Sequence, residues 1–273
     1  MDGLAGRVAL VTGCGAADGI GFATARALAQ AGARVAITST TARIHDRLAE
    51  LGPELGPALG SELGSELGPE PGCGHAAFIA DLTDSASVAR LVAAVARALG
   101  APPAILVNNA GMVQQGHKHR LARIEKVTDA DWAAHLAINA TTAFNMTRAV
   151  LPAMQRAGYG RIVNVASVTG PLVTIARAAG YSAAKAAMTG LTRATALENA
   201  ARGITCNAVL PGWIATGSSS AREIAAGRRS PTGRPGTPAE VAYACLFLAS
   251  AGAGYINGAM LVVDGANSLA EMK

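Results

Sequence analysis

The chain lacks the features that mark several large classes of protein. Only 15% of its 273 residues are charged, and the net charge of +5 is not gathered into a dense basic run. A nucleic-acid partner is therefore not expected. No uninterrupted apolar run is long enough to cross a bilayer, and residues 1–7 lack the apolar core of a signal peptide. We therefore expect a cytoplasmic protein with no membrane partner.

Cysteine is scarce as well. The chain has four cysteines, and their spacing fits neither a metal site nor a disulfide framework. Reduced thiols and no metal are therefore expected. His117 and His119 lie two residues apart without a third ligand nearby, which is poor support for a metal site.

Apolar residues, by contrast, make up 51% of the chain, enough for a buried parallel sheet covered by helices. Short apolar runs without clean alternation predict strands at Arg7–Thr12, Arg34–Ser39, Ala76–Ala80, Ala104–Asn108, Arg161–Ala166, Ile204–Leu210 and Ala259–Val263. Helices are predicted at Ile20–Ala31, Ser85–Leu99, Ala130–Ala157, Tyr181–Ala201 and Ala239–Ala249. This alternation predicts an α/β fold in one domain, a Rossmann-type doubly wound parallel β-sheet flanked by helices.

A glycine-rich turn, Gly13–Gly21, joins the first predicted strand to the first predicted helix. Glycines let the backbone turn sharply and approach a pyrophosphate, and a helix N-terminus offers free N–H groups. Because the turn has this strand–turn–helix context, it predicts a dinucleotide site. The candidate binding residues are Gly13, Gly15, Asp18, Gly19, Ile20 and Gly21.

Tyr181 and Lys185 stand four residues apart, so a helix places the phenol and the ammonium on one face. A positive charge beside a phenol is expected to lower its pKa from about 10. Such a phenol can exchange a proton with a substrate oxygen, and the Ser167 hydroxyl could hold that oxygen. The pair alone is a weak signal, since surface helices often contain it. The dinucleotide signature strengthens it.

Over essentially its whole length the chain resembles the classical short-chain dehydrogenase/reductase family, most generally its 3-oxoacyl-carrier-protein reductase-like members. The motifs occur in the family's order: Gly13–Gly21, Asp81-Leu82, Asn108–Gly111, Asn139, Ser167, Tyr181 with Lys185, and Pro211–Thr216. The resemblance implies an enzyme that transfers hydride between a nicotinamide and a carbonyl or secondary alcohol, with Tyr181 as general acid/base. It also implies a small-molecule substrate.

The resemblance implies further roles. Lys185 would lower the tyrosine pKa and bind the nicotinamide ribose, Ser167 would polarise the carbonyl, and Asn139 would hold a water for proton relay. The remaining residues implied to bind the cofactor are Asp81 and Leu82 at the adenine, Asn109, Ala110 and Gly111 at the adenosine, and Pro211, Gly212, Ile214 and Thr216 at the carboxamide. The segment Ser218–Ser230 is predicted to form a mobile substrate lid.

The end of the second predicted strand favours NADP over NAD. NAD-binding Rossmann proteins tend to place an acid there, but the sequence has Ser39, Thr40 and Arg43 and no acid until Asp46. Hydroxyls and a guanidinium suit a 2′-phosphate. Asp18 argues against NADP, because NADP-using relatives often carry a basic residue before Gly19. NAD is the alternative.

Two departures keep alternatives open. Five residues separate Gly13 from Gly19, a longer interval than usual that resembles enoyl reductases, whose tyrosine and lysine, however, are separated by six residues rather than three. Ser167 also lies one residue further from Tyr181 than usual. Enoyl reduction remains a minor option. A non-catalytic nucleotide sensor is another, although such proteins usually lose the tyrosine or lysine.

A tetrapeptide repeat of the type Leu-Gly-Pro-Glu occupies Leu51–Glu70, within an insert at about 51–74. Its glycines and prolines argue against a stable helix and favour a mobile surface expansion, with a partner-binding element as the alternative. The predicted helices Ala130–Ala157 and Tyr181–Ala201 are apolar over much of their surface. Self-association would bury such faces, and the family pairs these helices across a two-fold axis, so we predict a homotetramer, with a dimer as the alternative.

Overall fold

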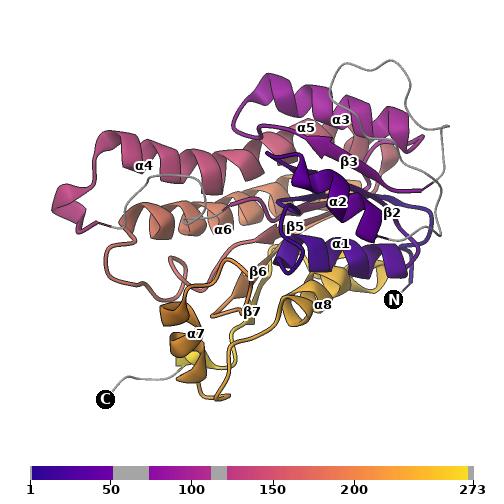
Figure 1. Ribbon diagram of the computed structural model, residues 1–273. Coiled ribbons are helices and arrows are strands. Elements are labelled where there is room, and N and C mark those ends of the chain that lie inside the picture. The colour runs from indigo at the N-terminus through magenta and orange to yellow at the C-terminus, as the bar shows by residue number, and fades with distance from the viewer. Residues whose placement is uncertain (1, 52–73, 112–121, 270–273) are drawn as a thin grey trace.

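The fold is built on one parallel sheet. The computed structural model describes residues 2–51, 74–111 and 122–269. Its strands are β1 (Val8–Thr12), β2 (Arg34–Ser39), β3 (Ala76–Ile79), β4 (Ile105–Asn108), β5 (Gly160–Val165), β6 (Ile204–Pro211) and β7 (Met260–Val263). They lie in the order β3-β2-β1-β4-β5-β6-β7 (Figure 1). The doubly wound fold is confirmed, and no strand end differs from its predicted position by more than one residue.

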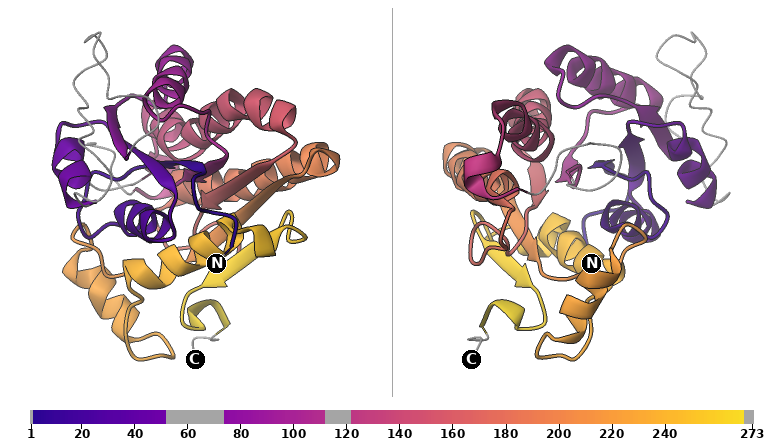
Figure 2. Two further views of the ribbon diagram at one scale, coloured as in Figure 1. Left: turned by 90° about the vertical axis from the view of Figure 1, so that its right-hand side faces the viewer. Right: turned by 60° about the vertical axis from the view of Figure 1, so that its left-hand side comes forward.

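Helices cover both faces of the sheet. They are α1 (Ile20–Gln30), α2 (Arg43–Glu50), α3 (Ser85–Ala98), α4 (Asp129–Leu136), α5 (Thr142–Ala157), α6 (Ala179–Asn199), α7 (Ala221–Arg228) and α8 (Pro238–Ala249). One face packs against α1, α2 and α8, and the other against α3, α5 and α6, as the two further views show (Figure 2). In β1, Ala9 and Val11 enter the first of these cores, whereas Val8 and Leu10 enter the second. Burial on both faces explains why the strands lack alternation.

The predicted helical stretch Ala130–Ala157 is helical throughout, but it is not one regular α-helix. A π-helical turn over Ala137–Thr141 separates α4 from α5. Asn139 lies in this turn, and its Nδ2 donates to the carbonyl of His135 at 3.2 Å. Because such a bond competes with the helix's own ladder, it accounts for the local irregularity. The short helix α2 was also absent from the predicted elements, and α6 begins two residues earlier than predicted.

Two features singled out from the sequence lie outside the described residues. These are most of the insert at 51–74 and the pair His117 and His119. Within the part of the chain that the structure does describe, no helix is long and apolar enough to cross a membrane.

Candidate active site

The glycine-rich turn is held against the end of β4. Gly13 has φ 71°, and a Cβ there would lie 2.8 Å from the Cα of Ala110; a Cβ at Gly21 would overlap Asn109 Nδ2. Asn109 Nδ2 donates to the carbonyls of Thr12 and Gly13 at 3.0 and 3.1 Å. These positions therefore require glycine because the neighbouring backbone and Asn109 approach them closely.

The start of α1 has the properties of a phosphate site. Its N-cap is Gly19, so no side chain caps the N–H groups of the first turn, and Ile20 and Gly21 are its first residues. The positive end of the helix dipole lies at the same place. Gly15 faces the end of β2, where a Cβ would lie 3.2 Å from Ser39 Cβ. This uncapped turn with a glycine approach fits a dinucleotide pyrophosphate.

Hydroxyl groups gather at the end of β2. The Ser39 hydroxyl donates to the carbonyl of Thr41 at 2.9 Å, and Thr40 is exposed. Arg43 is the exposed first residue of α2, and its Nε donates to the Thr41 hydroxyl at 3.4 Å. Arg43 therefore lies beside the predicted cofactor-selecting strand end, and Asp46 lies within the helix rather than at that end.

Asp18 lies at the far side of the glycine-rich turn from β2. A Cβ added to Gly217, in the segment after β6, would overlap the Asp18 carboxylate. The structure thus places Asp18 against the entrance to the predicted lid, while Gly15 is the residue of the turn that approaches Ser39.

Asp81 follows β3, but half of its carboxylate is already engaged. Its Oδ1 accepts from the Thr83 N–H at 2.8 Å and from the Thr83 hydroxyl at 2.6 Å. Leu82 is buried, and its carbonyl accepts from Asn145 Nδ2 at 3.1 Å. The loop is therefore ordered by its own bonds, which engage Oδ1 of the Asp81 carboxylate.

Sequence reasoning missed Thr12. Its hydroxyl, buried at the end of β1, accepts from the N–H groups of Asn109 and Ala110 at 3.0 and 2.9 Å and donates to the Val107 carbonyl at 3.3 Å. A polar residue that ends an otherwise apolar strand was the available signal. Thr12 fixes the β4 loop that is predicted to line the adenosine.

A buried amide chain, also missed, connects the strands with the helices behind the site. Asn108 Nδ2 donates to Thr147 in α5 at 3.1 Å and to Asn164 Oδ1 in β5 at 2.8 Å. Asn164 Nδ2 donates to Thr192 in α6 at 2.8 Å. Because buried polar groups must be paired, this chain specifies how α5 and α6 sit on the sheet.

Ser167, Tyr181 and Lys185 come together after β5. The Ser167 hydroxyl is close enough to Tyr181 to lower the pKa of its phenol, so the longer interval between them does not separate them. Lys185 lies one turn further along α6, with Nζ 5.8 Å from the Tyr181 ring centroid. It donates to the Val165 carbonyl at 2.9 Å. A proton donor, a partner hydroxyl and an amine therefore share one site.

The expected lowering of the Tyr181 pKa is wrong for this structure. Burial raises the pKa of Tyr181; the Ser167 hydroxyl acts in the opposite direction, and the Glu223 carboxylate raises it further. Burial also lowers the pKa of Lys185, which is 3% exposed, to about 8. The amine is directed to Val165, and its own charge is disfavoured, so it does not offset the burial of the phenol.

Asn139, Gly111 and Lys185 meet beside the tyrosine. Asn139 is fully buried, and its Oδ1 has no hydrogen-bond partner in the described structure. Gly111 has φ 149°, and a Cβ there would lie 2.8 Å from Asn139 Oδ1 and 3.4 Å from Lys185 Nζ. A buried acceptor without a protein partner is a site for a water or ligand. The π-helical turn therefore serves to present this oxygen.

The segment after β6 is hydrogen-bonded to the loop that carries Ser167. The Val168 N–H donates to the Pro211 carbonyl at 3.0 Å, and the Gly212 N–H donates to Val263. Ile214 pairs with Gly236, and the Thr216 hydroxyl lies 2.9 Å from that of Ser218. These bonds tie residues 211–216 to neighbouring loops near Ser167.

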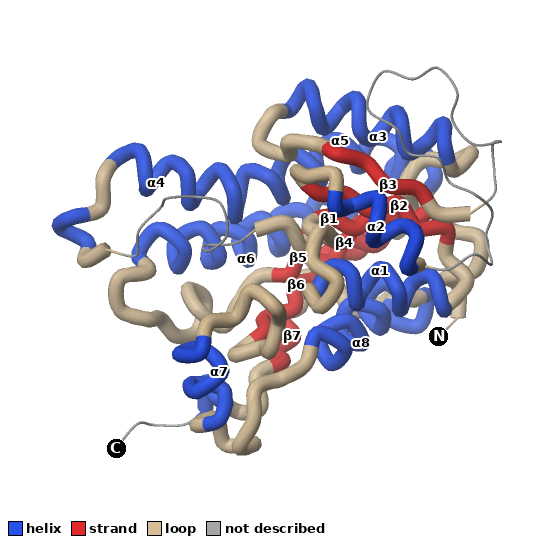
Figure 3. The backbone as a smooth tube through the Cα atoms, in the orientation of Figure 1, coloured by secondary structure: helices blue, strands red, loops and turns tan. Residues whose placement is uncertain are grey.

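The predicted lid, Ser218–Ser230, contains a helix. Ser220 and Glu223 form a reciprocal capping box that starts α7, which stands apart from the main helical layers (Figure 3). Glu223 also acts on the pKa of Tyr181. The Glu223 carboxylate of this segment therefore acts electrostatically on the candidate active site.

Cys14 packs inside the glycine-rich turn as a filler. It is fully buried, burial raises the pKa of its thiol, and its Sγ donates to the Val11 carbonyl. Among the residues whose positions are described, no three His, Cys, Asp or Glu side chains gather as a metal site would require.

Comparison with known proteins agrees with this geometry. The family model described as enoyl-(acyl carrier protein) reductase matches residues 15–266. Galactitol 2-dehydrogenase (L-tagatose-forming) of Cereibacter sphaeroides is 38% identical, with 96% of this chain and 95% of that protein covered. The 3-oxoacyl-[acyl-carrier-protein] reductase of Pseudomonas aeruginosa is 36% identical, with 96% and 97% covered.

A solved structure gives the same result. A Burkholderia xenovorans protein assigned to the short-chain dehydrogenases/reductases is 35% identical, with a TM-score of 0.85 over 98% of this chain and 99% of that one. The family-model match, the relatives over nearly full length and the shared fold all agree. The chain therefore belongs to the short-chain dehydrogenase/reductase family and is an oxidoreductase of that family.

Proposed function

We propose that the protein interconverts a carbonyl compound and its secondary alcohol with NADP(H), using Tyr181 as general acid/base. The observation that carries the proposal is the Ser167 hydroxyl beside the Tyr181 phenol, next to the buried amine of Lys185. A hydroxyl that positions an oxygen and a phenol that protonates it are what carbonyl reduction needs.

Tyr181 is in the acid form that reduction needs. The ordinary pKa of a phenol is about 10 and burial raises that of Tyr181 further, so the phenol is protonated at neutral pH and can give its proton to the substrate oxygen as negative charge develops there. Ser167 donates to the same oxygen and orients it. The bound nicotinamide supplies or accepts the hydride. Lys185 and a water held by Asn139 Oδ1 return a proton to Tyr181.

The residues proposed to bind the cofactor lie in the loops that follow the strands, from β1 to β6. The uncapped start of α1 takes the pyrophosphate, and Asp81 Oδ2 takes the adenine amino group. Arg43, with the hydroxyls of Ser39 and Thr40, takes a 2′-phosphate, which favours NADP over NAD. The exposed position of Arg43 at the end of β2 supports this choice.

Enoyl reduction is the second candidate. The matching family model carries that description, and the glycine-rich turn is longer than usual. Against it, Tyr181 and Lys185 occupy successive turns of α6 within one site that also holds Ser167. We therefore favour the carbonyl substrate, and paired ketone and enoyl compounds distinguish the two.

The decisive experiment is Tyr181→Phe, assayed by the absorbance of NADPH with a panel of ketones. General acid catalysis contributes about 10²–10⁴-fold, so turnover should fall by at least 10²-fold while NADPH affinity changes little. Tyr243→Phe, at an exposed tyrosine of α8, is the matched control and should retain full turnover. Wild-type turnover by Tyr181→Phe would refute the assignment, and NADPH binding without turnover of any compound would indicate a sensor.

We also propose a cytoplasmic homotetramer, with a dimer as the alternative. Phe144 of α5 and Leu197 of α6 are 43% and 82% exposed, and Leu261 and Val262 of the edge strand β7 are 36% and 39% exposed. Apolar side chains on two helices and on a sheet edge favour contacts with further copies. Light scattering that gives a monomer at micromolar concentration would contradict the proposal.

A further inference from the structure

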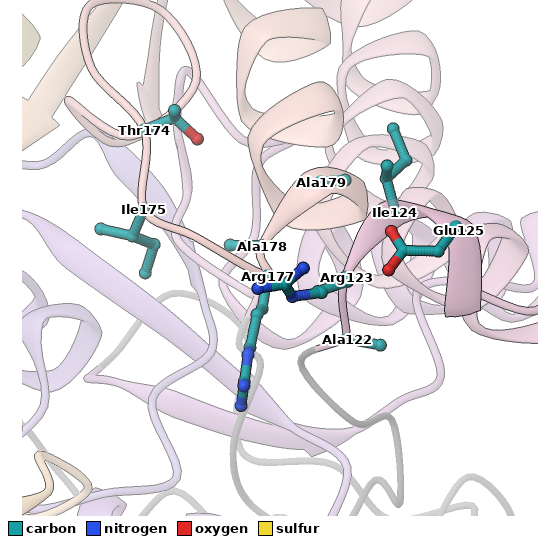
Figure 4. Close-up of a pocket in the computed structure, with 9 residues that line it drawn as sticks. All are labelled: Ala122, Arg123, Ile124, Glu125, Thr174, Ile175, Arg177, Ala178 and Ala179. Atoms are coloured by element: carbon teal, nitrogen blue, oxygen red, sulfur yellow. The ribbon is translucent and has the colours of Figure 1, made fainter.

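A pocket outside the groups described so far lies beside the start of α6. It has a volume of about 350 Å³ and is open to solvent on one side. One wall is the segment 122–125, which precedes α4, and the other is the segment 174–179, which leads into α6 (Figure 4). The pocket is thus formed by two segments that are distant in sequence.

The pocket carries a surplus of positive charge. Arg123 comes from one wall and Arg177 from the other, and both are exposed (Figure 4). Glu125 is the one acidic side chain of its lining. Within the described parts of the chain, no carboxylate lies within 4.0 Å of either arginine. Two guanidinium groups with no ion-pair partner suit a carboxylate or a phosphate group.

Arg177 has an unfavourable backbone conformation. Its φ is 73°, a conformation that residues other than glycine adopt rarely. The next residue, Ala178, is buried at the N-cap of α6, donates to the Ile175 carbonyl at 3.3 Å and accepts from the Ser182 N–H at 2.8 Å. An unfavourable conformation kept at a site is a reason to look for a function there.

The wall that carries Arg177 is also part of the active site. It belongs to the connection between Ser167 and Tyr181, and the Thr174 hydroxyl lies 2.9 Å from that of Ser182, the residue after Tyr181. Ala178 and Ala179 of this wall lie just before Tyr181 of α6, so the pocket adjoins the place where a substrate carbonyl would meet Ser167 and Tyr181. We infer that the substrate carries an anionic group, a carboxylate or a phosphate, which Arg123 and Arg177 bind. This inference rests on the proposed carbonyl chemistry.

The test compares three matched compounds: a keto acid, its neutral amide and its phosphate ester counterpart. Turnover with NADPH is measured for the wild type, Arg123→Gln and Arg177→Asn, because asparagine tolerates the left-handed backbone. Hydrogen bonds to charged groups are strong, so each variant should lose about tenfold in kcat/KM for its anionic substrate and stay within about twofold for the amide. The better of the two anionic compounds identifies the group. Arg193→Gln, at an exposed arginine of α6, is the control and should change neither.

Binding of the same compounds, measured by calorimetry, gives a readout separate from activity. Tighter binding of an anionic compound than of the amide, lost in Arg123→Gln and Arg177→Asn, supports the pocket even if neither compound is turned over. Such selective binding without turnover would contradict the proposed carbonyl chemistry but not the inference about the pocket. The inference would be overturned if the wild type showed the same kcat/KM and the same affinity for all three compounds. It would also be overturned if the variants lost as much kcat/KM for the amide as for the anionic compounds.

Discussion

The buried amine of Lys185 makes the stability of the protein depend on pH in a defined direction. Its ammonium is 3% exposed, and burial lowers its pKa from 10.5 to about 8. The folded state therefore binds fewer protons than the unfolded state between these two values. Stability consequently rises with pH through this window, because the unfolded chain gives up the proton that the folded chain has already lost.

The size of the effect follows from these two values. Each unit of pKa shift corresponds to about 1.4 kcal/mol, so the penalty for burying the ammonium is about 3 kcal/mol at pH 7. At pH 9.5 the folded amine is deprotonated and the unfolded amine is still largely protonated, so the penalty is the cost of removing a proton one unit below its pKa of 10.5, about 1.4 kcal/mol. Lys185→Met removes this titration and keeps a side chain of similar shape. The variant's stability relative to the wild type should therefore fall by about 2 kcal/mol between the two pH values.

Urea unfolding of both proteins at pH 7 and pH 9.5, at one protein concentration, measures this difference. Other titrating groups are common to both proteins, so the comparison isolates Lys185. Lys126→Met, at an exposed lysine before α4, should follow the wild type at both pH values. A relative stability of Lys185→Met that is constant between the two pH values would show that the amine titrates normally and would refute the reasoning.

Two further predictions test the site. Gly111→Ala should lower the free energy of unfolding by about 1–3 kcal/mol and reduce turnover, since φ is 149° and the added Cβ would crowd Asn139; Gly190→Ala, at a helical position with open space around it, should not destabilise. Arg43→Ala should weaken NADPH binding about tenfold and leave NADH binding nearly unchanged in fluorescence titrations, because a hydrogen bond to a charged group contributes roughly 1.5–3 kcal/mol. Equal losses for both cofactors would make Arg43 a structural residue, and Arg26→Ala is the exposed-arginine control.

The sheet could be predicted from the sequence because its signals are local. A parallel strand buried on both faces must be apolar at every position, so runs such as Val8–Thr12 stand out without any knowledge of their neighbours. The glycine-rich turn is equally local, since its positive φ at Gly13 and close approach at Gly21 demand glycine. Seven strands and the start of α1 were therefore placed to within about one residue.

The interruption within the helical stretch Ala130–Ala157 was not predicted, because a π-helical turn leaves little trace in composition. Alanine-rich sequence on both sides favours an ordinary helix, and only the contact of Asn139 with His135 interrupts the ladder. The resulting orphan oxygen, which lies beside Gly111, depends on packing between segments that are distant in the sequence.

The sequence by itself determined the α/β fold, the glycine-rich turn and the residue types of the candidate catalytic group, because each follows from local geometry or residue chemistry. The tertiary structure alone decided the direction in which the pKa values of that group shift. Tyr181 and Lys185 sit side by side as predicted, yet burial raises the pKa of one and lowers that of the other, since desolvation penalises whichever form is charged. The tertiary structure also brought Arg123 and Arg177 to one pocket, because no local pattern connects residues whose loops meet only after folding.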